Sequence, residues 1–245
     1  MCTLIALWRT VPGYDLVVGM NRDESQSRPA NPPSMIEGVP AIVAPRDRQA
    51  GGTWIGASGT GLIVALSNRR GRQSPAARSR GQLVLQALRQ PSVAGVDVFL
   101  QREVREHEYN FWNLFAASRK ELRFFRYDGE VSMSRGREGL NVLTNEGGNV
   151  PTDPKVQLIQ GLFAKASLDF DAVVHALQGA LRTHATAGGI GLCIHGQGMG
   201  TVSSTILALS NTDPGENVLL YADGPPGETP YRDYREVVLR LPLPE

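Results

Sequence analysis

A cysteine occupies the second position of the chain, directly after Met1. Initiator methionine is removed when the next residue is small, and removal here would place an α-amine on the residue that carries the thiol. Such an amine has a pKa of about 8 and can act as a base near neutral pH, which is how N-terminal nucleophiles are activated. Position alone, however, favours the plainer interpretation that Cys2 is a small buried side chain in a strand.

A polar tetrad, Asn21, Arg22, Asp23 and Glu24, ends the next apolar stretch. An aspartate near an N-terminal amine can accept its proton, and an arginine can bind a carboxylate or stabilise a thiolate. The alternative is a polar turn with a surface ion pair, which is the usual meaning of such a cluster. The tetrad alone does not decide between them.

Two further apolar segments, IVALSN and NVLTN, end in asparagines, Asn68 and Asn145. A side-chain amide at a strand end can donate a hydrogen bond to a developing oxyanion. Asparagine is also a common strand terminator, so either residue alone means little.

The segment AGGTW places Gly51 and Gly52 just before Trp54. The glycines permit unusual backbone angles or a close approach of two chain segments, and Trp54 is expected in a pocket wall or in the core. Later in the chain, Cys193 and His195 would share one face of a strand. They could form a catalytic pair, although packing is the commoner role of such a pair.

The other three histidines, His107, His175 and His184, are expected on or near helices in structural roles, and no spacing suggests a metal site. With 25 basic and 24 acidic residues the net charge is +1, which argues against nucleic-acid partners. The arginine-rich segment NRRGRQSPAARSRG is expected to be a solvated loop first and the rim of an anion site second.

Two cysteines are too few for a disulfide scaffold. The chain has no apolar run long enough to span a bilayer, and its start does not resemble a standard signal peptide, since it lacks a basic region and is broken by Arg9. A cytoplasmic protein that does not insert into membranes is therefore expected. The oligomeric state is left open.

The elements that must position these residues follow the order strands, two helices, strands, two helices, strands. Strand-like segments 2–8 and 14–21 read as an N-terminal hairpin, and the helices are expected within 79–90, 92–107, 152–166 and 169–185, the last ended by Gly188 and Gly189. The order disfavours a doubly wound parallel sheet and favours an α+β fold with antiparallel sheets and helices outside. One domain, residues 1–245, is expected. The Pro-rich stretch 28–40 is interpreted as a surface loop, and 191–196 and 233–241 as strands.

Several motifs together resemble the NRDE family, whose eukaryotic branch is called transport and Golgi organisation protein two. They are Met-Cys at the start, NRDES followed by SRP, RD followed by QAGGTWIGAS and TG, VALSNRR, RGQLV, VLTN followed by PKV, and the late GTVSST. The resemblance spans nearly the whole chain. It implies a four-layer αββα sandwich of two stacked antiparallel sheets, as in N-terminal nucleophile hydrolases. It also implies a distant similarity to choloylglycine hydrolase and penicillin V acylase, which cleave carbon–nitrogen amide bonds.

By motif position, the resemblance implies that Cys2 is the nucleophile, Asp23 orients the amine, Asn68 donates to the oxyanion and Asn145 is the second pocket asparagine. The residues expected to contact a substrate are Asn21, Arg22, Glu24, Trp54 and His195. Hydrolysis would need no metal and no cofactor.

This chain departs from the related amidases in having Met20 and Val202 where they or other family members carry arginine. Two functions therefore stay open. One is hydrolysis of an amide or acyl bond in a small hydrophobic substrate. The other is non-catalytic carriage of haem or of a lipid or acyl-coenzyme A, which the eukaryotic branch suggests, with Cys2, His195 and Trp54 as haem contacts.

Overall fold

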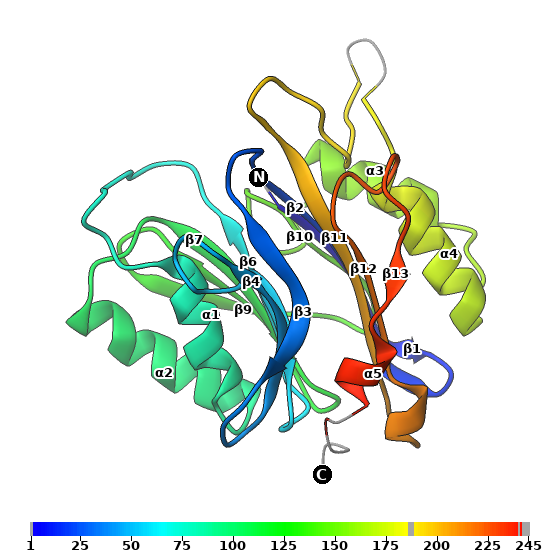
Figure 1. Cartoon of the computed structure of the whole chain (residues 1–245), viewed down its shortest axis with the longest axis horizontal. Helices are drawn as coiled ribbons and strands as arrows, with labels where there is room; N and C mark the ends of the chain where they lie inside the picture. Colours follow the sequence, from blue (N-terminus) through cyan, green and yellow to red (C-terminus); the bar gives the residue numbers. More distant parts are fainter. Residues whose placement is uncertain (1, 186–188, 240, 242–245) are drawn as a thin grey trace.

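The computed structural model describes residues 2–185, 189–239 and 241, and its main feature is a pair of antiparallel sheets stacked face to face (Figure 1). The first sheet has the order β10 (Gly139–Leu143), β1 (Thr3–Val11), β2 (Tyr14–Ser25), β11 (Met199–Ser210), β12 (Val218–Ala222) and β13 (Arg232–Asp233). The second has the order β3 (Ala30–Ile36), β4 (Ile42–Asp47), β5 (Ile55–Ser58), β6 (Ile63–Asn68), β7 (Trp112–Ala117), β8 (Leu122–Tyr127) and β9 (Val131–Arg135).

Helices cover the two outer faces. The second sheet is covered by α1 (Arg80–Leu88) and α2 (Val93–Glu106), and the first sheet by α3 (Pro154–Phe163) and α4 (Phe170–Leu181) (Figure 1). Three separate groups of buried side chains result: one between the sheets, and one between each sheet and its helix pair. The expected four-layer αββα sandwich is therefore confirmed.

Alternation along the central strands explains this layering. In β1, Leu4, Ala6 and Trp8 pack between the sheets, whereas Ile5 and Leu7 pack against α3 and α4. A strand covered on both faces is apolar at nearly every position. The N-terminal hairpin is confirmed, with β1 and β2 paired from Thr3 opposite Asn21 to Val11 opposite Tyr14.

Four expectations about individual elements were wrong. Part of the Pro-rich stretch forms β3, an edge strand, where proline is tolerated because one strand edge needs no partner. The stretch 191–196 is not a strand, and 233–241 forms mainly the short helix α5 (Arg235–Val238). Finally, α4 ends at Leu181, before the glycines expected to end it, and Gly188 lies outside the described residues.

Within the described ranges, no helix has the length and apolar character needed to cross a membrane.

Candidate functional site

A pocket of about 450 Å³ opens where Cys2 leads into β1 and where β2 and β6 end. The structure brings six of the nine predicted site residues into its lining: Cys2, Arg22, Asp23, Glu24, Trp54 and Asn68. They come from both sheets and from the loop before β5. A pocket of this size accommodates a small organic molecule.

Cys2 lies at the inner wall of this pocket and is only 6% exposed. Burial raises the pKa of its thiol, and the backbone N–H of Asp23, which donates to the sulfur, offsets part of that effect. The Cys2 carbonyl accepts a hydrogen bond of 3.2 Å from the Ser67 hydroxyl at the end of β6. The thiol therefore needs a base or a nearby positive charge to become the reactive thiolate. The predicted removal of Met1 concerns a residue outside the described part of the chain.

Asp23 is buried beside Cys2, near the end of β2. Its Oδ1 accepts a hydrogen bond of 2.6 Å from the Thr201 hydroxyl of β11. Burial raises the pKa of the Asp23 carboxyl, while the Thr201 hydrogen bond and the charge of Lys155 act in the opposite direction. A carboxyl whose pKa is raised can accept a proton more readily than an ordinary surface aspartate.

Arg22 forms the floor of the pocket together with Trp54. Its guanidinium lies 4.3 Å from the centre of the Trp54 ring, and its Nη2 donates to Asp47 Oδ2 at 2.9 Å. Asp47 also accepts from Arg28 at 2.6 Å and from the backbone N–H of Ala50 at 2.7 Å. Burial alone would raise the pKa of Asp47, but these hydrogen bonds and charges lower it overall. Arg28 and Asp47 lie within motifs that carry the family resemblance, SRP and RD, but the sequence alone assigned neither of them a role.

Two arginines from the basic segment, Arg78 and Arg80, also line the pocket. The Arg78 guanidinium is paired with Glu103 at 2.6 Å. Arg80 donates to the carbonyl of Phe111, and no ion pair is found for it among the described residues. Burial lowers its pKa, and the nearby charge of Glu24 opposes that effect. The interpretation of this segment as the rim of an anion site thus fits these two residues.

Close contact between two glycines places Arg80. A Cβ on Gly52 would lie 2.3 Å from the carbonyl carbon of Gly81, and the Thr53 N–H donates to the Gly81 carbonyl at 3.1 Å. Gly51 adopts a positive φ of 66°. Both uses predicted for these glycines, a special backbone angle and a close approach, are therefore present, and they dock the start of α1 onto the pocket.

Asn68 and Asn145 lie next to each other, but only Asn68 lines the pocket. The Asn145 side-chain amide donates to the Ser67 hydroxyl at 3.1 Å and to the Asn68 carbonyl. Since its N–H groups face the end of β6, Asn145 is placed to position Asn68 rather than to touch a substrate.

Asn21 and His195 do not reach the pocket. Asn21 is fully buried toward α4, and its amide donates at 2.9 Å to the carbonyls of Leu181 and Leu192. His195 lies in the loop before β11, beside Cys193 and His184. Met20 is fully buried between the sheets and provides no positive charge.

Two solved structures of similar shape are a hydrolase and an amidase by name. A cysteine-to-alanine variant of conjugated bile acid hydrolase from Clostridium perfringens superposes with a TM-score of 0.57 at 13% identity, over 96% of this chain and 93% of that one. The N-acylethanolamine-hydrolyzing acid amidase orthologue of Caenorhabditis elegans gives 0.55 at 11% identity, over 84% and 92%. These likenesses show an N-terminal nucleophile hydrolase-like fold and no more.

Sequence comparison identifies the family. The Transport and Golgi organization 2 homologues of Mus musculus and Homo sapiens are each 34% identical to this chain over 108 residues, a stretch that covers 42% of this chain. That match spans only 39% of the length of these relatives. The sequence model described as Transport and Golgi organisation 2 matches residues 1–187. The chain therefore belongs to the Transport and Golgi organisation 2 family.

Proposed function

We propose that this protein is an N-terminal cysteine hydrolase that cleaves an amide or acyl bond of a small substrate. The observation that supports this most is the burial of the Cys2 sulfur in a pocket wall, in hydrogen-bond contact with the backbone N–H of Asp23 and with Asn68 in the same lining. A nucleophile, a carboxylate and an amide donor are the groups that acyl transfer requires.

The proposed reaction begins after removal of Met1, with the α-amine of Cys2 as the base. The sulfur attacks the substrate carbonyl carbon, and the thiol proton passes to the amine while the Asn68 amide donates to the oxyanion. The amine then protonates the leaving nitrogen as the carbon–nitrogen bond breaks, which leaves a thioester on Cys2. Water, deprotonated by the same amine, hydrolyses the thioester and releases the acid. Asp23 would hold the amine in position.

The charges of the pocket suggest the substrate class. Arg80 is available to bind an anion, whereas Trp54 and Leu66 offer apolar surface in the same pocket. We therefore propose a substrate with an apolar acyl part and an anionic group, rather than a purely hydrophobic molecule.

Intact mass measurement of protein made without an N-terminal tag is the first test. Loss of Met1, followed by a mass increase at Cys2 with an activated acyl probe, is expected for the wild type. Cys2→Ser and Cys2→Ala should abolish thioester formation, and Cys193→Ser, the matched control at the other thiol, should keep it. Retention of Met1, or turnover by Cys2→Ala, would exclude the mechanism.

A second candidate is a carrier that binds haem or an acyl-coenzyme A without turning it over. The Arg80 guanidinium, for which no ion pair is found within the described part of the chain, favours it because both ligands carry anionic groups. The buried Met20 also leaves the thiol without one of the arginines of the related amidases. Two results together would favour this function. Haem, followed by its Soret shift, or acyl-coenzyme A should bind saturably and more weakly to Arg80→Ala, and no acyl probe should label the protein.

A further inference from the structure

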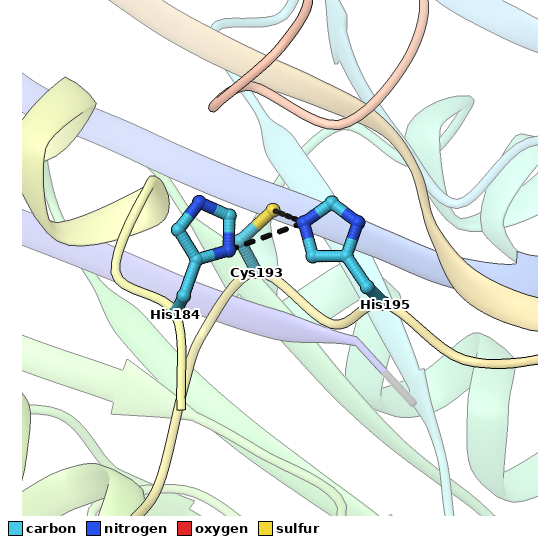
Figure 2. A group of neighbouring side chains, drawn as sticks. All are labelled: His184, Cys193 and His195. Atoms are coloured by element: carbon cyan, nitrogen blue, oxygen red, sulfur yellow. Dashed lines mark hydrogen bonds between the residues drawn. The ribbon is translucent and has the colours of Figure 1, made fainter. Parts of the chain in front are cut away.

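Three potential metal ligands meet in the loop region before β11, outside the pocket. His195 Nε2 lies 3.7 Å from Cys193 Sγ and 3.1 Å from His184 Nδ1, and all three atoms lie within 4.8 Å of one another. Figure 2 shows the two imidazoles on either side of the thiol, with both contacts reaching the same His195 nitrogen. We propose that His184, Cys193 and His195 bind a divalent transition-metal ion, Zn²⁺ by preference.

Two of the three ligand separations match those of a tetrahedral ion, and the third lies within 4.8 Å. Zinc–nitrogen bonds of about 2.0–2.1 Å and zinc–sulfur bonds of about 2.3 Å place two nitrogens about 3.3 Å apart and a nitrogen and a sulfur about 3.6 Å apart. The separations of 3.1 Å and 3.7 Å in the protein differ from these by a few tenths of an ångström. Thiolate and imidazole are also the donors that zinc prefers to carboxylate or carbonyl oxygens.

Hydrogen bonding alone satisfies this group poorly. His195 Nε2 faces both an imidazole nitrogen and a sulfur, and a neutral imidazole nitrogen carries at most one proton. It can therefore donate to one of its two neighbours only. A cation between the three atoms would accept a lone pair from each of them.

The surroundings resemble the second shell of a metal site. Glu228 Oε1 lies 3.5 Å from Nδ1 of His195, the ring nitrogen that would remain free, and a carboxylate in that place orients a metal-bound histidine. The backbone N–H of Gly227 contacts the Cys193 sulfur. A donor of this kind stabilises a thiolate.

Backbone contacts keep the ligands together without the ion. His184 and Cys193 form a bridge between parallel segments, and the N–H groups of Leu192 and Cys193 donate to the Thr183 carbonyl at 2.8 and 2.9 Å. Cys193 is 2% exposed, whereas the His195 side chain is 42% exposed. An ion can thus enter from the solvent side, where water can supply a fourth ligand.

The sequence predicted that Cys193 and His195 lie together, but it predicted no metal site, because the ligands follow no regular zinc spacing and His184 was expected in a structural role. Another group, Glu103, Glu106 and His107, is a weaker candidate. Glu103 already accepts hydrogen bonds from Arg78 at 2.6 Å and from Tyr109 at 2.7 Å.

One hydroxyl joins the proposed metal site to the pocket. The Thr201 side chain contacts the Cys193 sulfur, accepts a hydrogen bond from the Ile194 N–H at 2.9 Å and donates to Asp23 at 2.6 Å. Metal binding would therefore fix the loop before β11 and, through Thr201, the orientation of the Asp23 carboxylate. The metal site itself does not depend on the proposed hydrolysis.

Cobalt titration of the Cys2→Ser protein, purified with a chelator and without a histidine tag, tests the proposal. The chain has two cysteines, so Cys193 is then the single thiol. The expected result is a saturable thiolate-to-cobalt charge-transfer band at one ion per chain, together with the intense visible bands of a tetrahedral ion, displaced by Zn²⁺. Absence of the charge-transfer band would overturn the proposal.

Variants identify the ligands. In the Cys2→Ser background, Cys193→Ser should abolish the charge-transfer band, and His184→Ala and His195→Ala should each weaken binding by more than tenfold. Glu228→Gln should weaken it by about tenfold, at the low end of the 10–100-fold effect of second-shell changes, because Glu228 is exposed. His175→Ala, at an exposed position of α4, is the matched control and should bind as the parent does. A band that persists without Cys193, or that His175→Ala removes as well, would place the ion elsewhere.

Discussion

At the residue scale, the site combines a buried thiol with a buried carboxylate. Burial raises the pKa of both Cys2 and Asp23, so each group is biased toward its neutral form. Burying these groups lowers the stability of the fold. They become reactive only if a charge on the substrate or on the free α-amine favours their ionised forms. The same two groups therefore lower the stability of the fold and provide the reactive side chains of the site.

Asp23→Asn separates the effect of this carboxyl on activity from its effect on stability. The amide keeps an oxygen that can accept from Thr201, but it has no negative charge to hold the protonated α-amine of Cys2, and we expect turnover to fall by about 100-fold or more. The unfolded carboxyl has a pKa of about 3.9. Because the folded pKa is higher, the wild type should lose stability as the pH rises from there through the folded value, and the variant should not. Urea unfolding from acid to neutral pH measures this difference. If the free energies of unfolding of the wild type and the variant depended on pH in the same way, the raised pKa of Asp23 would be contradicted.

Arg80 should govern the affinity for anionic ligands. Hydrogen bonds to a charged group contribute about 1.5–3 kcal/mol, so Arg80→Ala should weaken binding of an anionic substrate or ligand by about tenfold or more. Arg80→Lys should recover part of the loss. Arg105→Ala, at an exposed position near the end of α2, is the control and should leave the affinity unchanged. Titration calorimetry measures the affinity of each variant. Equal losses in Arg80→Ala and Arg105→Ala would show that the net charge of the protein, and not a contact with Arg80, is the cause.

At the scale of elements, the contact between Gly52 and the start of α1 positions one wall of the pocket. A methyl group at Gly52 would overlap the Gly81 backbone, so Gly52→Ala should destabilise the protein by about 1–3 kcal/mol and displace Arg80. Gly179, an exposed glycine inside α4 with open space around its Cβ position, gives the opposite control. Gly179→Ala should stabilise the protein by about 0.5–1 kcal/mol. Denaturant unfolding compares the two, and equal effects would mean that the close contact is unimportant.

Much of the element order could be predicted from the sequence, because the central strands and the four long helices have clear periodicity and caps. Asp153 and Ser92, for example, cap α3 and α2 through their side chains, whereas Ser79 makes no such hydrogen bond at the start of α1. The edge strand β3 could not be found, since proline suggested a loop. The segment that forms α5 was interpreted as a strand. Its apolar residues, which include Val238, pack in the core between the sheets, as the residues of a strand would.

The candidate site was predictable where a residue belongs to a motif, and not where packing selects it. Cys2, Asp23 and Asn68 were named from the sequence, and all three line the pocket. Asn21 shares a face of β2 with Asp23, but its amide is bound by the carbonyls of Leu181 and Leu192, contacts that the motif does not predict. Arg80 became distinguishable from its neighbouring arginines only when α1 was seen docked against Gly52.

At the scale of the whole molecule, one ion pair ties the two sheets together at the pocket. Arg22 belongs to β2 of the first sheet and Asp47 to β4 of the second, and both side chains are less than a tenth exposed. Removing one partner of a buried pair leaves the other charge unsatisfied. The stability of the sandwich and the shape of its pocket therefore depend on the same contact.

Asp47→Ala should destabilise the protein by about 3–5 kcal/mol, since it leaves the Arg22 guanidinium without its buried partner. Asp47 has a lowered folded pKa, so its contribution should be present above a pH of about 3.9 and be lost as the pH falls through the folded value. Glu108→Ala, which removes a half-exposed pair with Arg72, should cost about 1 kcal/mol or less. Urea unfolding at neutral and acid pH measures both, and similar losses would contradict the role of burial.

The strand order also fixes when the site can exist during synthesis. β2 pairs with β1 on one side and with β11 on the other, and Asp23 and its partner Thr201 are 178 positions apart. While the ribosome is still making the middle of the chain, β2 offers an unpaired edge of the kind that recruits other chains. A nascent polypeptide therefore carries the Cys2 thiol from the first moments of translation, but it assembles the surroundings of that thiol only after β11 has emerged.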